Sequence, residues 1–121
     1  MNNQKVSIPE WYDHKNQFCN LGKHEWNVAR LIQLSKDLIP FRIPLLHLNM
    51  YNTYNTLRLR DFVMHMKVVH AADLTCPIIL DEDGELLDGR HRIMKALFLD
   101  HVDILAVRFN VNPSPDTVKD N

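Results

Sequence analysis

The segment LLDGRHRIMKA, residues 86–96, constrains the fold of this chain more than any other stretch. Its two leucines predict a short strand, and Asp88-Gly89 break that strand, because glycine adopts backbone conformations that other residues avoid. Apolar residues then recur at helical spacing. The segment therefore predicts a strand that turns tightly into a helix, and the positions expected to face inward on this helix are Ile93, Ala96 and Leu97.

The first turn of the predicted helix carries three basic side chains, Arg90, His91 and Arg92. A helix N-terminus presents unpaired N–H groups and about half a positive charge, so cations there oppose the dipole by some tenths of a kcal/mol each. A phosphate between them removes this conflict, and Gly89 leaves room for a ligand near the backbone. The turn therefore predicts a phosphate site held by Gly89, Arg90, His91 and Arg92.

Asp88 directly precedes this turn and has two interpretations. Its carboxylate can position a metal-bound phosphate or accept a hydroxyl proton, with His91 as the second catalytic candidate. It can also be a turn former or helix cap worth about 1 kcal/mol. A structural alternative exists for the arginines as well, because Arg90 and Arg92 can form surface ion pairs with acids nearby, namely Asp88, Glu85 or Glu82.

Periodicity and helix-breaking residues predict the remaining elements. In the first half they are a helix over 24–38 ended by Pro40, a strand over 41–49 with Pro44 at an edge or bulge, a loop after it and a helix over 57–72. In the second half they are strands over 78–80 and 85–87 joined by the turn 81–84, a helix over 90–99 and a strand over 103–109. This order predicts an α+β (mixed α/β) domain with helices packed on a small mixed sheet. The domain is expected over 22–110, between an irregular arm at 1–21 and a flexible tail at 111–121.

The predicted helix over 57–72 carries a second group of candidate residues. Its basic residues include Arg60 and Lys67, for which a solvated helix face is the favoured interpretation from the residues alone. Asp61 and His65 lie one helical turn apart and are expected to pair. The apolar stripe of this helix is expected to face the core and comprises Leu59, Phe62, Val63, Met66 and Val69.

Composition limits the class of protein. The chain has 121 residues, a net charge of −1 and a sequence pI of about 6.6, which argues against a strongly basic nucleic-acid module. Its two cysteines, Cys19 and Cys76, do not form a disulfide framework, and Cys76 is expected to be a small core residue. No signal peptide, membrane span or zinc-ligand pattern is visible, so we expect a cytoplasmic protein with no membrane partner and no metal ligands of its own.

The succession of a PIIL strand, a short hairpin, the turn DGRHR, a helix and the strand DILAVRF resembles the ParB/sulfiredoxin-like superfamily. The resemblance covers about residues 41–109 and includes ParB N-terminal nucleotide-binding domains and ParB-like nuclease domains. It implies a ParB/sulfiredoxin-like fold in which the helix before the PIIL strand lines the nucleotide pocket, so that Arg60 and Lys67 become candidates for binding phosphate or a polymer backbone. Gly89 matches the turn glycine, and His91 and Arg92 match the His-Arg pair that contacts nucleotide phosphates in sulfiredoxin. Arg90 stands where sulfiredoxin carries its catalytic cysteine, so sulfinic acid reductase activity is not expected.

Three functions follow from these residues and the resemblance. The first is binding of a nucleotide, such as ATP, ADP or CTP with Mg²⁺, together with phosphoryl-transfer or NTP-hydrolysis activity. The second is a phage- or plasmid-type DNA-associated accessory module, in which the same turn contacts a nucleic-acid phosphate. The near-neutral charge weakens this second function, because Lys and Arg supply most non-specific DNA affinity. The third is a catalytically inert interaction domain.

Overall fold

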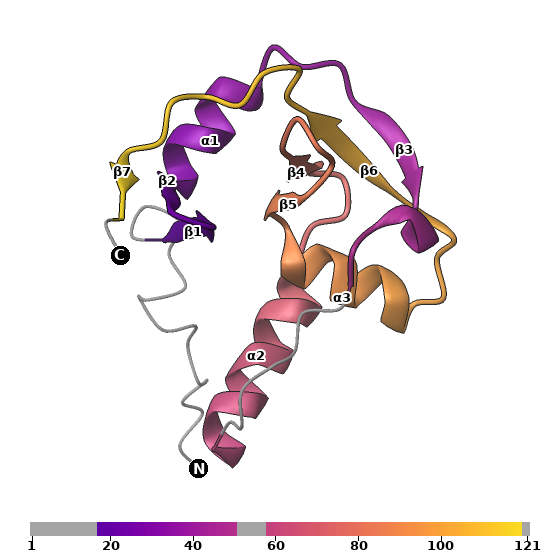
Figure 1. Cartoon of the computed structure of the whole chain (residues 1–121). Coiled ribbons are helices and arrows are strands. Elements are labelled where there is room, and N and C mark those ends of the chain that lie inside the picture. Colours follow the sequence, from indigo (N-terminus) through magenta and orange to yellow (C-terminus); the bar gives the residue numbers. More distant parts are fainter. Residues whose placement is uncertain (1–16, 51–57, 120–121) are drawn as a thin grey trace.

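A four-stranded mixed sheet lies at the centre of the computed structural model, which describes residues 17–50 and 58–119 (Figure 1). Its strands, in spatial order, are β3 (Phe41–Pro44), β6 (Asp103–Arg108), β4 (Ile78–Leu80) and β5 (Leu86–Asp88). Strands β4 and β6 run parallel, and the other two pairs are antiparallel. The mixed α+β class, the hairpin β4–β5 and the edge position of Pro44 are therefore confirmed.

Both faces of this sheet are buried. Side chains alternate along a strand, so Ile78 and Leu80 of β4 pack on one face with Ile93 and Ala96 of helix α3 (Arg90–Phe98). Ile79 faces the other way, into a second core cluster that contains Trp26, Leu31, Leu87, Val107 and Phe109. The apolar run at 78–80 thus forms the middle layer of the domain, and all three of its residues are buried.

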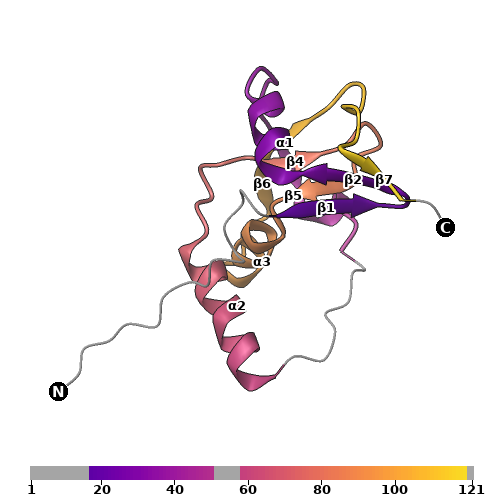
Figure 2. The same cartoon turned by 90° about the vertical axis from the view of Figure 1, so that its left-hand side faces the viewer.

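The second face is covered by helix α1 (Val28–Ser35) and by a three-stranded antiparallel sheet. This sheet contains β1 (Phe18–Leu21), β2 (His24–Asn27) and β7 (Thr117–Val118), in the order β1-β2-β7 (Figure 2). Residues 24–27 were expected to be helical, and this expectation is wrong. Asn27 ends the strand with an extended backbone and its side-chain oxygen accepts a hydrogen bond from the Arg30 N–H, so the helix begins only at Val28.

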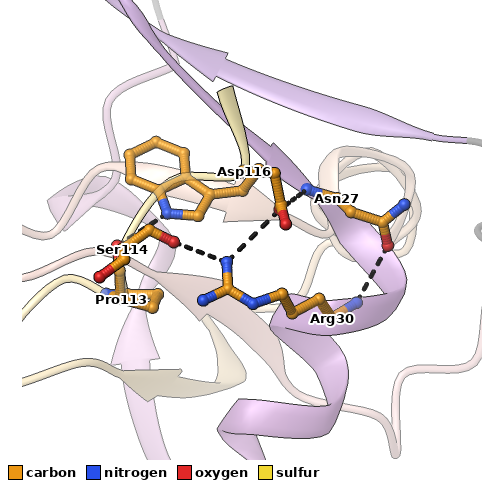
Figure 3. Close-up of polar contacts among 6 residues, drawn as sticks. Asn27, Arg30, Pro113, Ser114 and Asp116 are labelled. Atoms are coloured by element: carbon orange, nitrogen blue, oxygen red, sulfur yellow. Dashed lines mark hydrogen bonds and ion pairs between the residues drawn. The ribbon is translucent and has the colours of Figure 1, made fainter. Parts of the chain in front are cut away.

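Strand β7 lies in the segment expected to be a flexible tail, and polar contacts hold that segment against β2 and α1 (Figure 3). The Trp26 indole N–H donates to the Pro113 carbonyl over 2.9 Å. The Arg30 guanidinium donates to the Ser114 carbonyl over 2.6 Å and pairs with Asp116 at 3.4 Å. The structure therefore places this segment, as far as β7, against the domain. At the other end of the chain, Phe18–Leu21 form a strand where an irregular arm was expected, and residues 1–16 lie outside the described residues.

The segment after β3 also differs from expectation. The strand expected over 41–49 ends at Pro44, where a short 3₁₀-helix, η3 (Leu45–His47), begins. Leu45 and Leu48 turn into the core from this segment. Most of the loop expected before the second helix falls at 51–57, outside the described residues.

Helix α2 (Leu59–Ala71) confirms the predicted second helix, but its apolar stripe does not face the core. Leu59 is 81% exposed, Phe62 54%, and Val63 and Met66 each 45%, while Met64 is the buried residue of the helix. The reason is that α2 packs on α3 at the margin of the domain (Figures 1 and 2). Leu97 of α3 is likewise exposed rather than inward. Within the described ranges, no helix has the length and apolar character required to cross a membrane.

Candidate functional site

The turn between β5 and α3 is formed around Gly89, which has a φ of +119°. A Cβ at this position would lie 2.5 Å from Cγ2 of Ile78, well inside van der Waals contact. The glycine is therefore required by the close approach of the turn to strand β4. This packing role, rather than room for a ligand, accounts for Gly89.

The N-terminus of α3 carries cations and no side-chain cap. Gly89 occupies the N-cap position, and no side chain caps the helix with a hydrogen bond. The first intrahelical bond runs from the Ile93 N–H to the Gly89 carbonyl at 3.0 Å. Arg90, His91 and Arg92 occupy the first turn with no acidic residue among them. As predicted, this helix end combines a positive dipole with positive side chains.

Arg92 is only partly satisfied by protein partners. One of its terminal nitrogens pairs with Oδ2 of Asp88 at 2.8 Å, and both side chains are about one-fifth exposed. The ion pair proposed as the structural alternative therefore forms between these two residues. The Nε of Arg92, however, is buried and has no hydrogen-bond partner among the described residues. Because buried donors are nearly always paired in proteins, this unpaired donor is an exception that asks for an explanation.

His65 of α2 joins the site by contact with His91. The two rings stack with centroids 5.7 Å apart, and Nδ1 of His65 lies 3.4 Å from Nε2 of His91. Burial, followed by the neighbouring His65 and Arg90, lowers the pKa of His91 to about 4. Burial and Arg90 also lower the pKa of His65. Both imidazoles are therefore neutral near pH 7, and the contact between them uses one of their two N–H groups as the donor.

Cys19 approaches the site from β1, which packs beside β5. Burial raises the pKa of its thiol to about 11, and the charge of Asp88 adds to this rise while Arg90 opposes it. The thiol therefore stays protonated and unreactive near neutral pH. The other cysteine, Cys76, is exposed, so its assignment as a core residue is wrong.

The other two sequence candidates, Arg60 and Lys67, lie on a different face of α2. At about 100° per residue, they lie about 140° and 160° around the helix from His65. Lys67 lines an open hollow with Val63, Met66, His70 and Ala71. The helix therefore directs His65 toward α3 and places Arg60 and Lys67 away from the turn.

His65 and Cys19 are the site residues that the sequence analysis did not assign to the turn. His65 was expected to pair with Asp61, and the charge of Asp61 does act on it. No local signal links His65 with His91, because the contact depends on how α2 packs against α3. Cys19 lies in a strand whose position depends on pairing with β2.

No cluster of three or more His, Cys, Asp or Glu side chains within 17–50 and 58–119 is arranged to hold a metal ion. Comparisons with family models, curated proteins and solved structures find no match for this chain. The resemblance to the ParB/sulfiredoxin-like superfamily therefore stays a prediction made from the turn and its neighbouring strands.

Proposed function

We propose that this protein binds a phosphate group, carried by a nucleotide, at the N-terminus of α3. Arg90, His91 and Arg92 hold the phosphate, and His65 contributes from α2. The observation that carries the proposal is the buried, unpaired Nε of Arg92 in the first turn of a helix without a side-chain cap. After a movement of the side chains that cover Nε, a phosphate oxygen there would satisfy this donor and offset the conflict between the two arginine charges and the helix dipole.

The state of the histidines supports an anion at this place. Burial lowers the pKa of both His65 and His91, and nearby positive charge lowers it further. An additional positive charge beside this pair is therefore disfavoured. A bound phosphate reverses the sign of the local field and raises both pKa values. Protonation of one imidazole then adds a charge-assisted hydrogen bond to the phosphate.

Asp88 takes a binding role in this proposal. Its Oδ2 accepts the hydrogen bond from Arg92 and so orients the guanidinium. A role in phosphoryl transfer or nucleotide hydrolysis, with Mg²⁺ on the triphosphate, requires Asp88 to exchange this partner for metal or substrate. Phosphoryl transfer or hydrolysis is therefore the second step of the proposal, and it requires that phosphate binding is found first.

Calorimetric titration with ATP, ADP and CTP, each with and without Mg²⁺, and with inorganic phosphate tests the proposal. We expect binding to weaken about tenfold in Arg92→Met, which removes the guanidinium that contains the buried Nε. A loss of this size corresponds to one charge-assisted hydrogen bond. Arg42→Met, which removes an exposed guanidinium of the edge strand β3 that pairs with Asp103 of β6, is the matched control and should bind normally. Absence of binding at millimolar ligand would refute the proposal.

Binding of a DNA duplex that falls steeply with added salt would favour the DNA-associated function instead.

A further inference from the structure

The outer face of α2 is the largest feature that the phosphate proposal leaves unexplained. Leu59, Val63, Met66 and His70 follow one another at spacings of four, three and four residues, which is the spacing of the seam in a helix–helix contact. The three apolar members of this seam are exposed, and the hollow described above lies along it. Exposed apolar stripes of this kind are typical of protein-interaction surfaces.

The seam continues onto α3. The ring of His70 packs edge-on against Phe98, with ring centroids 5.7 Å apart. Phe98 is itself 70% exposed at the last residue of α3. The outer face of α2 and the end of α3 therefore form one apolar surface, which we call the α2 seam. Helix α2 extends away from both sheets (Figures 1 and 2).

On helix α2 itself, the charged side chains beside the seam are both basic. Arg60 and Lys67 directly follow the seam residues Leu59 and Met66, so both occupy the same edge position, seven residues apart. Asp61, the acidic residue of the described helix, lies on the opposite side with His65. Residues at such edge positions form the interhelical ion pairs that decide which partner a helix accepts.

We propose that the α2 seam docks an amphipathic helix of another protein whose flanking positions are acidic. The apolar seam supplies the contact area, and Arg60 and Lys67 select the partner by charge complementarity. This proposal rests on α2 and the end of α3, and it does not depend on phosphate binding at the α3 N-terminus.

A second copy of this chain fits the seam poorly. In an antiparallel pair, Arg60 and Lys67 of one copy would face the same cations of the other. In a parallel pair they would face Phe62 and Val69, the other edge positions of the helix. Neither arrangement offers an acidic partner. A nucleic acid would match the cations but not the apolar seam, because nucleic-acid interfaces are predominantly polar.

Two helix-forming peptides test the proposal directly. Both carry leucine at the seam positions, one has glutamate at both flanking positions and the other has lysine there. By fluorescence anisotropy we expect the full chain to bind the glutamate peptide at least about tenfold more tightly than the lysine peptide. The double substitution Arg60→Glu with Lys67→Glu should reverse this preference, and a reversed preference also shows that the variant is folded.

The control variant carries the same change in charge at exposed positions outside α2, Lys23→Glu with Lys36→Glu, and should keep the original preference. Equal affinity for both peptides, no binding of either, or an unchanged preference in the Arg60 and Lys67 variant would overturn the proposal. It would also fail if the chain bound phosphatidylserine-containing vesicles but not the glutamate peptide. A dimer in sedimentation analysis that Val63→Glu abolishes would show that the seam accepts a second copy instead.

Discussion

Gly89 shows how a single residue fixes the relation between strand and helix. Its positive φ and the contact with Ile78 both exclude a side chain, so the turn accepts no other residue without movement of β4. The same geometry places the first turn of α3 where His91 contacts His65 of α2. At this scale, packing of one backbone atom against one isoleucine determines where the candidate site lies.

Gly89→Ala should lower the free energy of unfolding by about 2–4 kcal/mol, because it combines a left-handed backbone with overpacking against Ile78. Denaturation in urea measures this loss. Gly22→Ala is the matched control, since Gly22 also has a positive φ, of +59°, but its Cβ would meet no atom within 4 Å. The control should lose only about 1 kcal/mol. Equal losses in the two variants would contradict the packing role of Gly89.

His91 should make stability depend on pH. Its pKa in the folded protein is about 4, below the ordinary value of 6.5, so the unfolded chain takes up a proton first as the pH falls. Stability is therefore complete above pH 6.5 and falls between pH 6.5 and 4, by on the order of 1 kcal/mol after allowance for solvent screening. His91→Gln should flatten this slope in urea denaturation series. His101→Gln, at an exposed position, should leave the slope unchanged; a slope unaffected by His91→Gln would contradict the assignment.

At the scale of elements, α2 and α3 hold each other through polar contacts at their ends. The ammonium of Lys95 donates to the carbonyls of His70 and Ala72, at 2.9 and 2.7 Å, and so caps the C-terminus of α2. A cation there also complements the helix dipole. This contact fixes the position of α2 and, with it, the contact between His65 and His91.

Lys95→Met should remove both hydrogen bonds while keeping the apolar stem of the side chain. We expect the amides in the last turn of α2 to exchange with solvent about tenfold faster, as loss of about 1.4 kcal/mol of local stability implies. Hydrogen exchange read by NMR measures this change. Lys36→Met, at the exposed end of α1, is the control. Unchanged exchange in the Lys95 variant would show that other contacts hold the end of α2.

The elements that sequence reasoning located best are those with local signals. Pro77 directly precedes β4, Gly84 lies in the turn between β4 and β5, and Gly89 directly precedes α3. The hairpin and the following helix could therefore be predicted closely. Strand β7 could not, because it pairs with β2 across some ninety residues of chain. The β1–β2 hairpin turns at Gly22-Lys23, which is a local signal that the sequence analysis did not use. The stripe of α2 was misjudged because periodicity identifies a helix but not the neighbour that covers it.

For the molecule as a whole, the described parts divide into a core and two surfaces for which we propose binding roles. The central sheet, covered by α3 on one face and by α1 with the small sheet on the other, is the rigid core. The N-terminus of α3 and the outer face of α2 lie outside this core, and each carries basic side chains. They are Arg90, His91 and Arg92 on α3, and Arg60 and Lys67 on α2. The sequence identified the first surface through its misplaced cations. It also assigned Arg60 and Lys67 to this first surface. That they lie on a different face becomes visible only from the packing of α2.

The central claim, phosphate binding at the first turn of α3, is tested most directly by an NMR titration of the full chain with inorganic phosphate. We predict shifts of the backbone amides of Arg90, His91 and Arg92, together with a rise in the pKa of His91, because a bound anion stabilises the imidazolium. Saturable shifts confined to these residues and His65 would support the claim. Unchanged amides in this turn at saturating phosphate, or shifts confined to the cations of α2, would contradict it.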